Sequence, residues 1–172
     1  MRQLTVDVNV LVHGSVPSDP THLPCNDLMR ALEGRIDCKL IMDSEERIYR
    51  QYSKHLKGRP YGVKWLKSML SNGRVVHLDR AHIDNSIRIR FAERGFVGED
   101  YDNFVRTCAA SCCKVIASYD PDFSAVEKLL WKQLGIRLRS ATDARRFAVA
   151  GRCERCDGAA SSGLAPVPSE EA

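Results

Sequence analysis

The chain lacks any apolar run that approaches the roughly 18 residues needed for a membrane-spanning helix. It also lacks a recognisable secretory leader, because Asp7 and Asn9 interrupt the apolar stretch that follows Arg2. The chain lacks a strong excess of either charge: it has 26 lysines and arginines and 22 acidic residues, which leaves a formal charge of +4. Such a mild excess permits a nucleic-acid partner without requiring one. We therefore expect a soluble cytoplasmic protein that does not associate with membranes.

The chain has enough hydrophobic residues to form one buried core. Hydrophobic residues make up 44% of its 172 residues and charged residues 28%, so it is not a disordered segment. From Cys153 onward the composition changes to Gly, Ala, Ser, Pro and Glu, which is typical of a tail. The sequence predicts one domain over residues 1–150 and a flexible tail with a Cys-x-x-Cys motif over 151–172.

Short apolar segments alternate with segments of helical periodicity along the chain. The predicted strands are residues 4–11, 39–42, 74–78, 114–118 and 136–138. The predicted helices are residues 23–32, 43–55, 63–70, 81–94, 102–112, 121–130 and 142–150. Buried strands that alternate with helices favour parallel pairing through right-handed crossovers. The predicted fold is therefore α/β, a three-layer α/β/α sandwich with a parallel central sheet.

Acidic residues recur where the predicted strands end. Asp7 lies at the first strand, Asp120 and Asp122 directly follow the strand over 114–118, and Asp102 begins the helix before it. Ligands of open parallel sheets bind outside the carboxyl ends of the strands, so these acids are expected to lie at one edge. Hard oxygen ligands in such a cleft suit Mg²⁺ or Mn²⁺. The alternative is that the acids cap helices and turns, which explains Asp7 less well than the others.

These segments resemble the motifs of PIN-domain nucleases. Residues 7–11 (DVNVL) are similar to the D-x-N-x-L opening of that family, and residues 118–123 (SYDPDF) to its later [TS]-x-D-x-D-F segment. Residues 102–105 (DNFV), followed by Ala109, match the helix start that supplies a third acid. Residues 41–56 resemble the strand and helix that carry the glutamate of the family. The resemblance spans roughly residues 4–140, with the motifs in the family's order.

The resemblance implies an acidic cleft that binds Mg²⁺ or Mn²⁺ and hydrolyses phosphodiester bonds, usually in RNA. The resemblance makes Asp7, Asp102 and Asp120 metal ligands, with Asp122 as an outer ligand or turn residue. Asn9 and Ser118 are expected to orient ligands or substrate. Asp100 remains an alternative to Asp102 as the third acid.

The second acid departs from the family pattern. The position expected to carry it is Gln51, beside Tyr52, and an amide supplies no charge. Asp43, Glu45 or Glu46 can reach the site if the register follows the end of the strand, and we favour Glu46. If none does, metal binding is weakened, and the fold is expected to be slow or inactive as an enzyme.

Basic and aromatic residues cluster shortly after this helix. Lys54, Lys57 and Arg59 are candidates for phosphate contacts, and Tyr61 and Trp65 are candidates for stacking on bases. A solvated helix face explains the same charges without any ligand.

The seven cysteines are an odd number, so reduced thiols are expected in this chain. Cys153 and Cys156 have the spacing of half a zinc site, but a structural site needs four ligands. No second motif follows, so we expect no zinc unless Cys112, Cys113 or a partner chain completes the set.

The sequence thus predicts a metal-dependent nuclease of PIN type with Asp7, Glu46, Asp102 and Asp120 as its catalytic acids. RNA is the expected substrate, and family analogy adds a toxin–antitoxin role with an antitoxin partner. A homodimer is also expected, because it would join two basic faces around one substrate. The alternative is a catalytically weak PIN fold that binds RNA or a protein, which the glutamine at position 51 motivates. A phosphoacceptor domain ranks last, because it needs an acidic pair after the first strand, where Asp7 stands alone.

Overall fold

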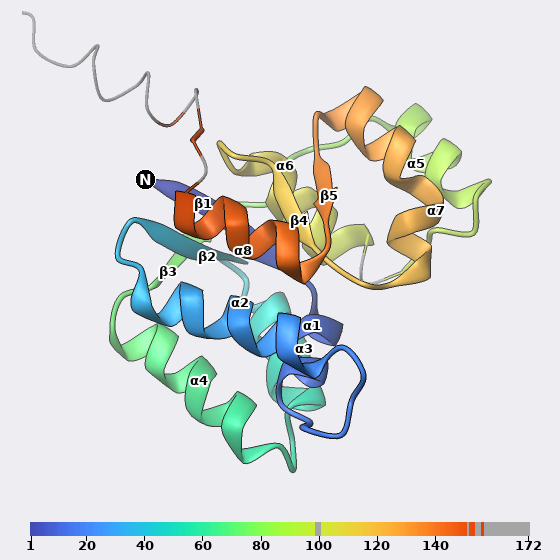
Figure 1. Cartoon of the computed structure of the whole chain (residues 1–172). Helices are drawn as coiled ribbons and strands as arrows, with labels where there is room; N and C mark the ends of the chain where they lie inside the picture. Colours follow the sequence, from blue (N-terminus) through green and yellow to red (C-terminus); the bar gives the residue numbers. More distant parts are fainter. Residues whose placement is uncertain (99–100, 151, 154–155, 157–172) are drawn as a thin grey trace, which may run out of the picture.

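The computed structural model describes residues 1–98, 101–150, 152–153 and 156. Its five strands form a single parallel sheet in the order β3-β2-β1-β4-β5 (Figure 1). The strands are β1 (Arg2–Val6), β2 (Cys38–Asp43), β3 (Val75–Leu78), β4 (Val115–Ala117) and β5 (Arg137–Arg139). The predicted α/β class with a parallel central sheet is confirmed.

Helices connect the strands and cover the sheet. They are α1 (Val8–Gly14), α2 (His22–Gly34), α3 (Arg47–His55), α4 (Pro60–Ser71), α5 (Asn85–Ala92), α6 (Arg106–Ala110), α7 (Pro121–Leu129) and α8 (Ala141–Ala150), with two π-helical segments, η1 (Tyr101–Val105) and η2 (Leu130–Leu134). Figure 1 shows α2 and α8 packed side by side across one face of the sheet, with α5 and α7 grouped on the other side. The strand order explains why these helices lie on different faces. The connections from β1 to β2 and from β4 to β5 run in opposite directions across the sheet, so right-handed crossovers place α2 and α7 on opposite faces.

The core lies between the sheet and these helices. In the central strand β1, Leu4 and Val6 are fully buried, and Tyr52 of α3 donates its hydroxyl hydrogen to the carbonyl oxygen of Val6. This contact anchors α3 at the carboxyl end of β1. None of the helices in the described part of the chain is long and apolar enough to cross a membrane.

The first predicted strand was wrong beyond Val6. The apolar run over residues 4–11 divides into β1 and the helix α1, with Asp7 between them in an extended conformation. Val10, Leu11 and Gly14 are the buried residues of α1, and their three- and four-residue spacing is helical. Short apolar runs do not distinguish a buried strand from a buried helix, which explains the error. The helix predicted over residues 81–94 is also shorter, since α5 covers only Asn85–Ala92.

The predicted domain ends where the helix α8 ends, at Ala150. Most of the proposed tail, residues 151, 154–155 and 157–172, lies outside the described residues. The two cysteines of that segment are described, and Cys153 is buried.

Candidate functional site

Adjacent strand ends bring three of the predicted site residues together. β1 pairs with β4, so Asp7 and Ser118 both directly follow the ends of neighbouring strands. The Ser118 hydroxyl donates to the Asp7 carboxylate at 2.5 Å, and Asp7 is only 2% exposed. Asn9 approaches the same hydroxyl through its amide nitrogen at 3.5 Å, and its carbonyl oxygen accepts from the Tyr119 backbone at 3.4 Å. Asp7, Asn9 and Ser118 therefore form one hydrogen-bonded group at the carboxyl edge of the sheet, where the acids were expected.

Asp120 adjoins this group, but its carboxylate also has a structural role. Its backbone N–H donates to the Ser118 hydroxyl oxygen at 2.9 Å. Its side chain accepts from the backbone N–H of Asp122 at 2.8 Å, so Asp120 caps α7. Asp122 is exposed in the first turn of that helix. Both readings of Asp120 therefore hold: it lies at the carboxyl edge of the sheet, and it is a helix cap.

The three candidates for the second acid occupy different environments. Asp43 is fully buried, and its two carboxylate oxygens accept from the backbone N–H groups of Arg47 and Ile48 at 2.9 and 2.7 Å. It is therefore the cap of α3, a structural role. Glu46, the favoured candidate, is exposed and holds the left-handed conformation with a φ of 60°. Of the three, Glu45 alone lines the pocket described next.

A pocket of about 750 Å³ lies between α3 and η1. Residues of α3 and the turn before it form one wall, and the η1 segment forms the other. The lining residues are Glu45, Arg47, Arg50, Gln51, Lys54, Gly98, Asp102 and Asn103. Gln51 thus lies in the wall where the resemblance requires an acid. The side-chain amide oxygen of Asn103, a residue given no role of its own above, has no hydrogen-bond partner within the described residues.

Arginines surround the acid of η1. Arg80 donates to Asp102 at 2.6 Å, Arg106 at 3.0 Å, and Arg47 approaches to 3.9 Å. Arg80 also bonds Glu45 at 3.0 Å. Burial acts to raise the pKa of Asp102, but the hydrogen bonds from Arg106 and Arg80 outweigh it and hold this pKa below its ordinary value. Hydrogen bonds from Arg80 and Arg47 likewise lower the pKa of Glu45. Both carboxylates are therefore charged and paired at neutral pH.

The pocket and its immediate surroundings carry an excess of positive charge. Arg80 and Arg106 offset the charges of Glu45 and Asp102. Arg47 bonds Glu45 as well, at 2.9 Å, so within the described residues the lining cations with no acidic partner are Arg50 and Lys54, both on α3. An acidic cleft was predicted, whereas the arrangement favours an anionic ligand. Arg80 and Arg106 were not singled out from the sequence, and no local pattern distinguishes them from other surface arginines.

The acids do not form a ready site for Mg²⁺ or Mn²⁺. In the described part of the chain, the one group of three or more acidic, histidine or cysteine ligand atoms close enough to share a metal ion is a set of cysteines. Asp7, Asp102 and Asp120 are not brought together in this way, and Asp102 is already neutralised by arginines. Asp100, the alternative third acid, lies outside the described residues. The residues as arranged do not fit a directly bound Mg²⁺ or Mn²⁺ ion.

The remaining predicted contacts are only partly at the pocket. Lys54 lines it, whereas Lys57 and Arg59 belong to the turn between α3 and α4 and are not in its lining. Arg59 donates to the carbonyl oxygen of His55 at 2.6 Å. Trp65 is 2% exposed and donates its indole N–H to the Met29 carbonyl at 2.8 Å, so it belongs to the core and is not available for base stacking.

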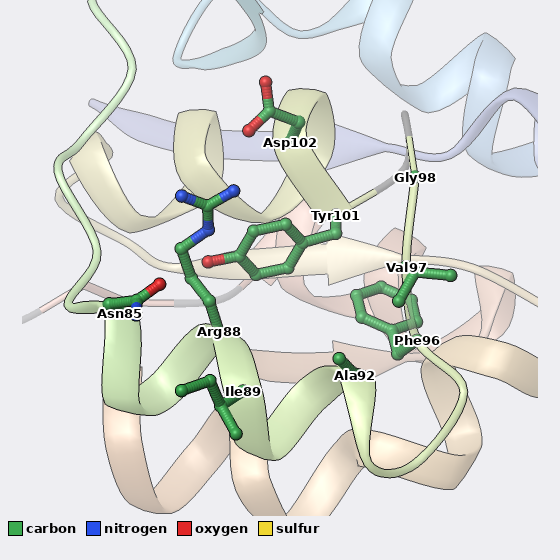
Figure 2. A pocket seen from close by; sticks show the side chains of 9 residues that line it. All are labelled: Asn85, Arg88, Ile89, Ala92, Phe96, Val97, Gly98, Tyr101 and Asp102. Carbon is green, nitrogen blue, oxygen red and sulfur yellow. The ribbon is translucent and has the colours of Figure 1, made fainter.

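A second hollow of about 430 Å³ adjoins the pocket (Figure 2). It shares Gly98 and Asp102 with the pocket and adds Arg88 from α5. Figure 2 shows the Arg88 guanidinium beside the ring of Tyr101, on the side that faces Asp102. Burial raises the pKa of Tyr101 above its ordinary value, so its phenol is neutral. This hollow extends the pocket surface with a further cation.

Comparisons with protein-family models, with curated proteins and with solved structures find no match to this chain. The PIN-domain resemblance therefore stays a prediction, which depends on the motifs and on the arrangement of the residues alone.

Proposed function

We propose that this protein binds single-stranded RNA through the pocket between α3 and η1. The observation that carries the proposal is the excess of cations in the pocket: Arg47, Arg50 and Lys54 line it, while Arg80 and Arg106 neutralise its acids. Neutralisation of phosphates by lysine and arginine supplies most of the affinity of sequence-independent nucleic-acid binding. The proposal corresponds to a PIN-like fold that binds RNA and is weak as a catalyst.

The shape of the pocket supports RNA over a small anion. At about 750 Å³ it exceeds the space that one phosphate fills. The amides of Gln51 and Asn103 lie in the wall beside the cations, and amides hydrogen-bond the edges of unpaired bases. Single-stranded segments present such edges together with the phosphates, whereas a duplex conceals them.

The binding test uses a short fluorescein-labelled single-stranded RNA of mixed sequence and measures fluorescence anisotropy. The double variant Arg50→Gln/Lys54→Gln is expected to weaken binding by about 10-fold or more at moderate salt. The slope of log K against log salt should fall by about 0.7 for each lost phosphate contact. Lys132→Gln removes an exposed charge of η2, outside the pocket lining, and serves as the matched control. Equal loss in the control and the double variant, or no binding by the wild type, refutes the proposal.

Metal-dependent hydrolysis of RNA is the second candidate. It is favoured by the grouping of Asp7, Asn9 and Ser118 at the carboxyl edge of the sheet, next to Asp120, although these residues as arranged do not fit a directly bound metal ion. The same RNA is incubated with Mg²⁺, Mn²⁺ or EDTA, with wild type and Asp7→Asn side by side. Cleavage that needs metal and disappears in Asp7→Asn establishes a nuclease. If the protein binds the RNA but leaves it intact under all conditions, binding is its function and hydrolysis is not. An antitoxin partner remains a prediction of the resemblance, and a homodimer remains a prediction based on the basic faces.

A further inference from the structure

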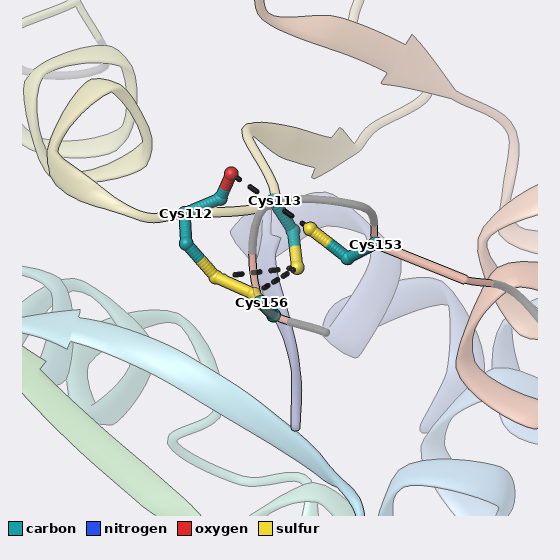
Figure 3. Close-up of side chains that lie close together, drawn as sticks. All are labelled: Cys112, Cys113, Cys153 and Cys156. Carbon is teal, nitrogen blue, oxygen red and sulfur yellow. Dashed lines mark hydrogen bonds between the residues drawn. A yellow bond between two sulfur atoms is a disulfide. The ribbon is translucent and has the colours of Figure 1, made fainter. Parts of the chain in front are cut away.

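Four cysteines from two distant segments lie together near the start of β4 (Figure 3). Cys112 and Cys113 lie in the turn between α6 and β4, and Cys153 and Cys156 follow α8. Their sulfur atoms all lie within 4.8 Å of one another. Cys113 Sγ is 3.6 Å from Cys112 Sγ and 3.3 Å from Cys156 Sγ. The function proposed above uses none of these residues.

The spacing of the sulfurs matches a tetrahedral metal site. Zinc–thiolate bonds of about 2.3 Å place the sulfurs of a regular tetrahedron about 3.8 Å apart. The separations of 3.6 and 3.3 Å at Cys113 are close to that value, whereas Cys112 and Cys156 are bonded to each other and have to move apart. Thiolates are soft ligands that select zinc over Mg²⁺ or Mn²⁺, and four of them occupy every position of tetrahedral zinc. The chemistry of such a site is structural, since no position remains open for water or substrate.

The surroundings hold the cysteine turn in place. The backbone N–H of Gln3 donates to Cys113 Sγ at 3.2 Å, and the Gln3 side chain accepts from the Cys112 N–H at 2.9 Å. Lys114 follows in the left-handed conformation, with a φ of 50°. Backbone donors to sulfur and an ordered outer shell are what orient the ligands of metal sites. Lys114 and Arg152 line the adjacent hollow and place positive charge beside a tetrathiolate zinc, which carries two negative charges.

In the structure two of these four sulfurs, those of Cys112 and Cys156, form a disulfide. The disulfide and a four-thiolate site exclude each other, so the zinc form requires reduction. A dithiol reductant breaks the sulfur–sulfur bond, leaves two cysteine thiols and is itself oxidised to a disulfide. The four thiols then bind one Zn²⁺ and release four protons.

We propose that, in the reduced protein, Cys112, Cys113, Cys153 and Cys156 hold one Zn²⁺ ion in a closed structural site. The site fastens the segment that follows α8 to the start of β4. Metal binding of this kind contributes directly to the free energy of folding, because the unfolded chain does not hold the four ligands together. The site therefore connects the end of the domain to an inner strand of the sheet.

The primary experiment measures zinc per chain by plasma mass spectrometry, after zinc-supplemented expression and purification with a dithiol. Wild type is expected to carry one zinc per chain, and Cys113→Ser and Cys156→Ser close to none. Cys25→Ser and Cys38→Ser change buried cysteines outside the cluster and are the matched controls, which should retain the metal. Zinc-free reduced wild type, or equal zinc in the cluster variants and the controls, overturns the proposal.

A second measurement on the wild type alone removes the question of whether a variant folds. Cobalt added to reduced, metal-free protein should produce the thiolate-to-cobalt charge-transfer absorption of a tetrahedral four-sulfur site. Mass spectrometry after alkylation should find four more reactive thiols when zinc is removed with EDTA. A Cys112–Cys156 disulfide that persists in the dithiol-treated protein, with no cobalt absorption, overturns the zinc site.

Discussion

Replacement of Arg80 by methionine tests the central electrostatic feature of the pocket. Arg80 is 10% exposed and bonds Asp102 at 2.6 Å and Glu45 at 3.0 Å. Methionine retains an unbranched apolar side chain of similar reach and removes the charge. Arg80→Met leaves Asp102 paired with Arg106 at 3.0 Å, so the carboxylate loses one partner and not both.

The expected loss of stability follows from the exposure of the two acids. Glu45 is half exposed, so its pair with Arg80 is screened by water and is left out of the sum. Asp102 is 31% exposed, and its charge-assisted bond from the largely buried Arg80 is the contact that matters. Removing it is expected to cost about 2 kcal/mol of unfolding free energy at neutral pH. A double-mutant cycle with Asp102→Asn should return a coupling of about 1–2 kcal/mol.

The pH dependence distinguishes charge from packing. The folded-state pKa values of Asp102 and Glu45 are both lowered, so their contribution is present above the unfolded pKa values, near 4. It is lost as the pH falls through the lower folded-state values. The difference between wild type and Arg80→Met should therefore be full at pH 7 and shrink steadily below about pH 4.

The assay is equilibrium urea unfolding followed by tryptophan fluorescence, since Trp65 is buried in the fold and becomes exposed on unfolding. Arg90→Met removes an exposed arginine of α5 and serves as the control, with an expected effect below about 0.5 kcal/mol. A loss that is the same at pH 7 and at pH 3.5 would show that the aliphatic stem of Arg80 stabilises the fold, and not its charge. That result would refute the reasoning.

Two further predictions concern the fold that positions the pocket. Asp43→Ala should destabilise the protein by about 2–3 kcal/mol, because two backbone N–H groups of α3 lose a buried charged acceptor, whereas Ser44→Ala on the exposed neighbour should cost little. Chemical denaturation measures both, and equal losses would contradict the capping role. Gly62→Ala should cost about 1–3 kcal/mol, since its Cβ would lie 2.6 Å from a Leu56 methyl carbon. Gly34→Ala, whose Cβ meets nothing within 4 Å, should be neutral or stabilising in thermal melts, and a reversed order would contradict the packing argument.

The class of fold could be predicted from the sequence because it depends on local patterns of apolar and turn residues. Four of the five predicted strands appear within a residue or two of their expected bounds, since each is a short apolar run between turn residues. The error at α1 arose where the run over residues 4–11 continued past the last backbone partner of β1. The Asp7 N–H still bonds the Ala117 carbonyl, but β4 ends there, and the chain turns into a helix.

The candidate site was only half predictable. Asp7 and Ser118 directly follow parallel strands, so the expected parallel pairing predicts both at the same edge of the sheet. That β1 and β4 are neighbours, which brings the two side chains into contact, is known only from the structure. The environment of Asp102 does not follow in this way. Arg80 comes after β3 and reaches an acid 22 positions later through the packing of η1, which no local period records. The cysteines show the same contrast. The spacing of Cys153 and Cys156 indicates half a metal site in the sequence, whereas only the structure shows that Cys112 and Cys113 lie beside them.

The sequence alone predicts a parallel α/β domain with Asp7, Asp120 and Asp122 at the carboxyl edge of its sheet. The reason is that hydrophobic periodicity, and the position of an acid directly after a strand, are properties of residues that are neighbours along the chain. The cationic pocket beside this edge and the cluster of four cysteines could be seen only in the structure. Both features depend on side chains that approach from separate segments, and the distances between such side chains are set by how the helices pack on the sheet.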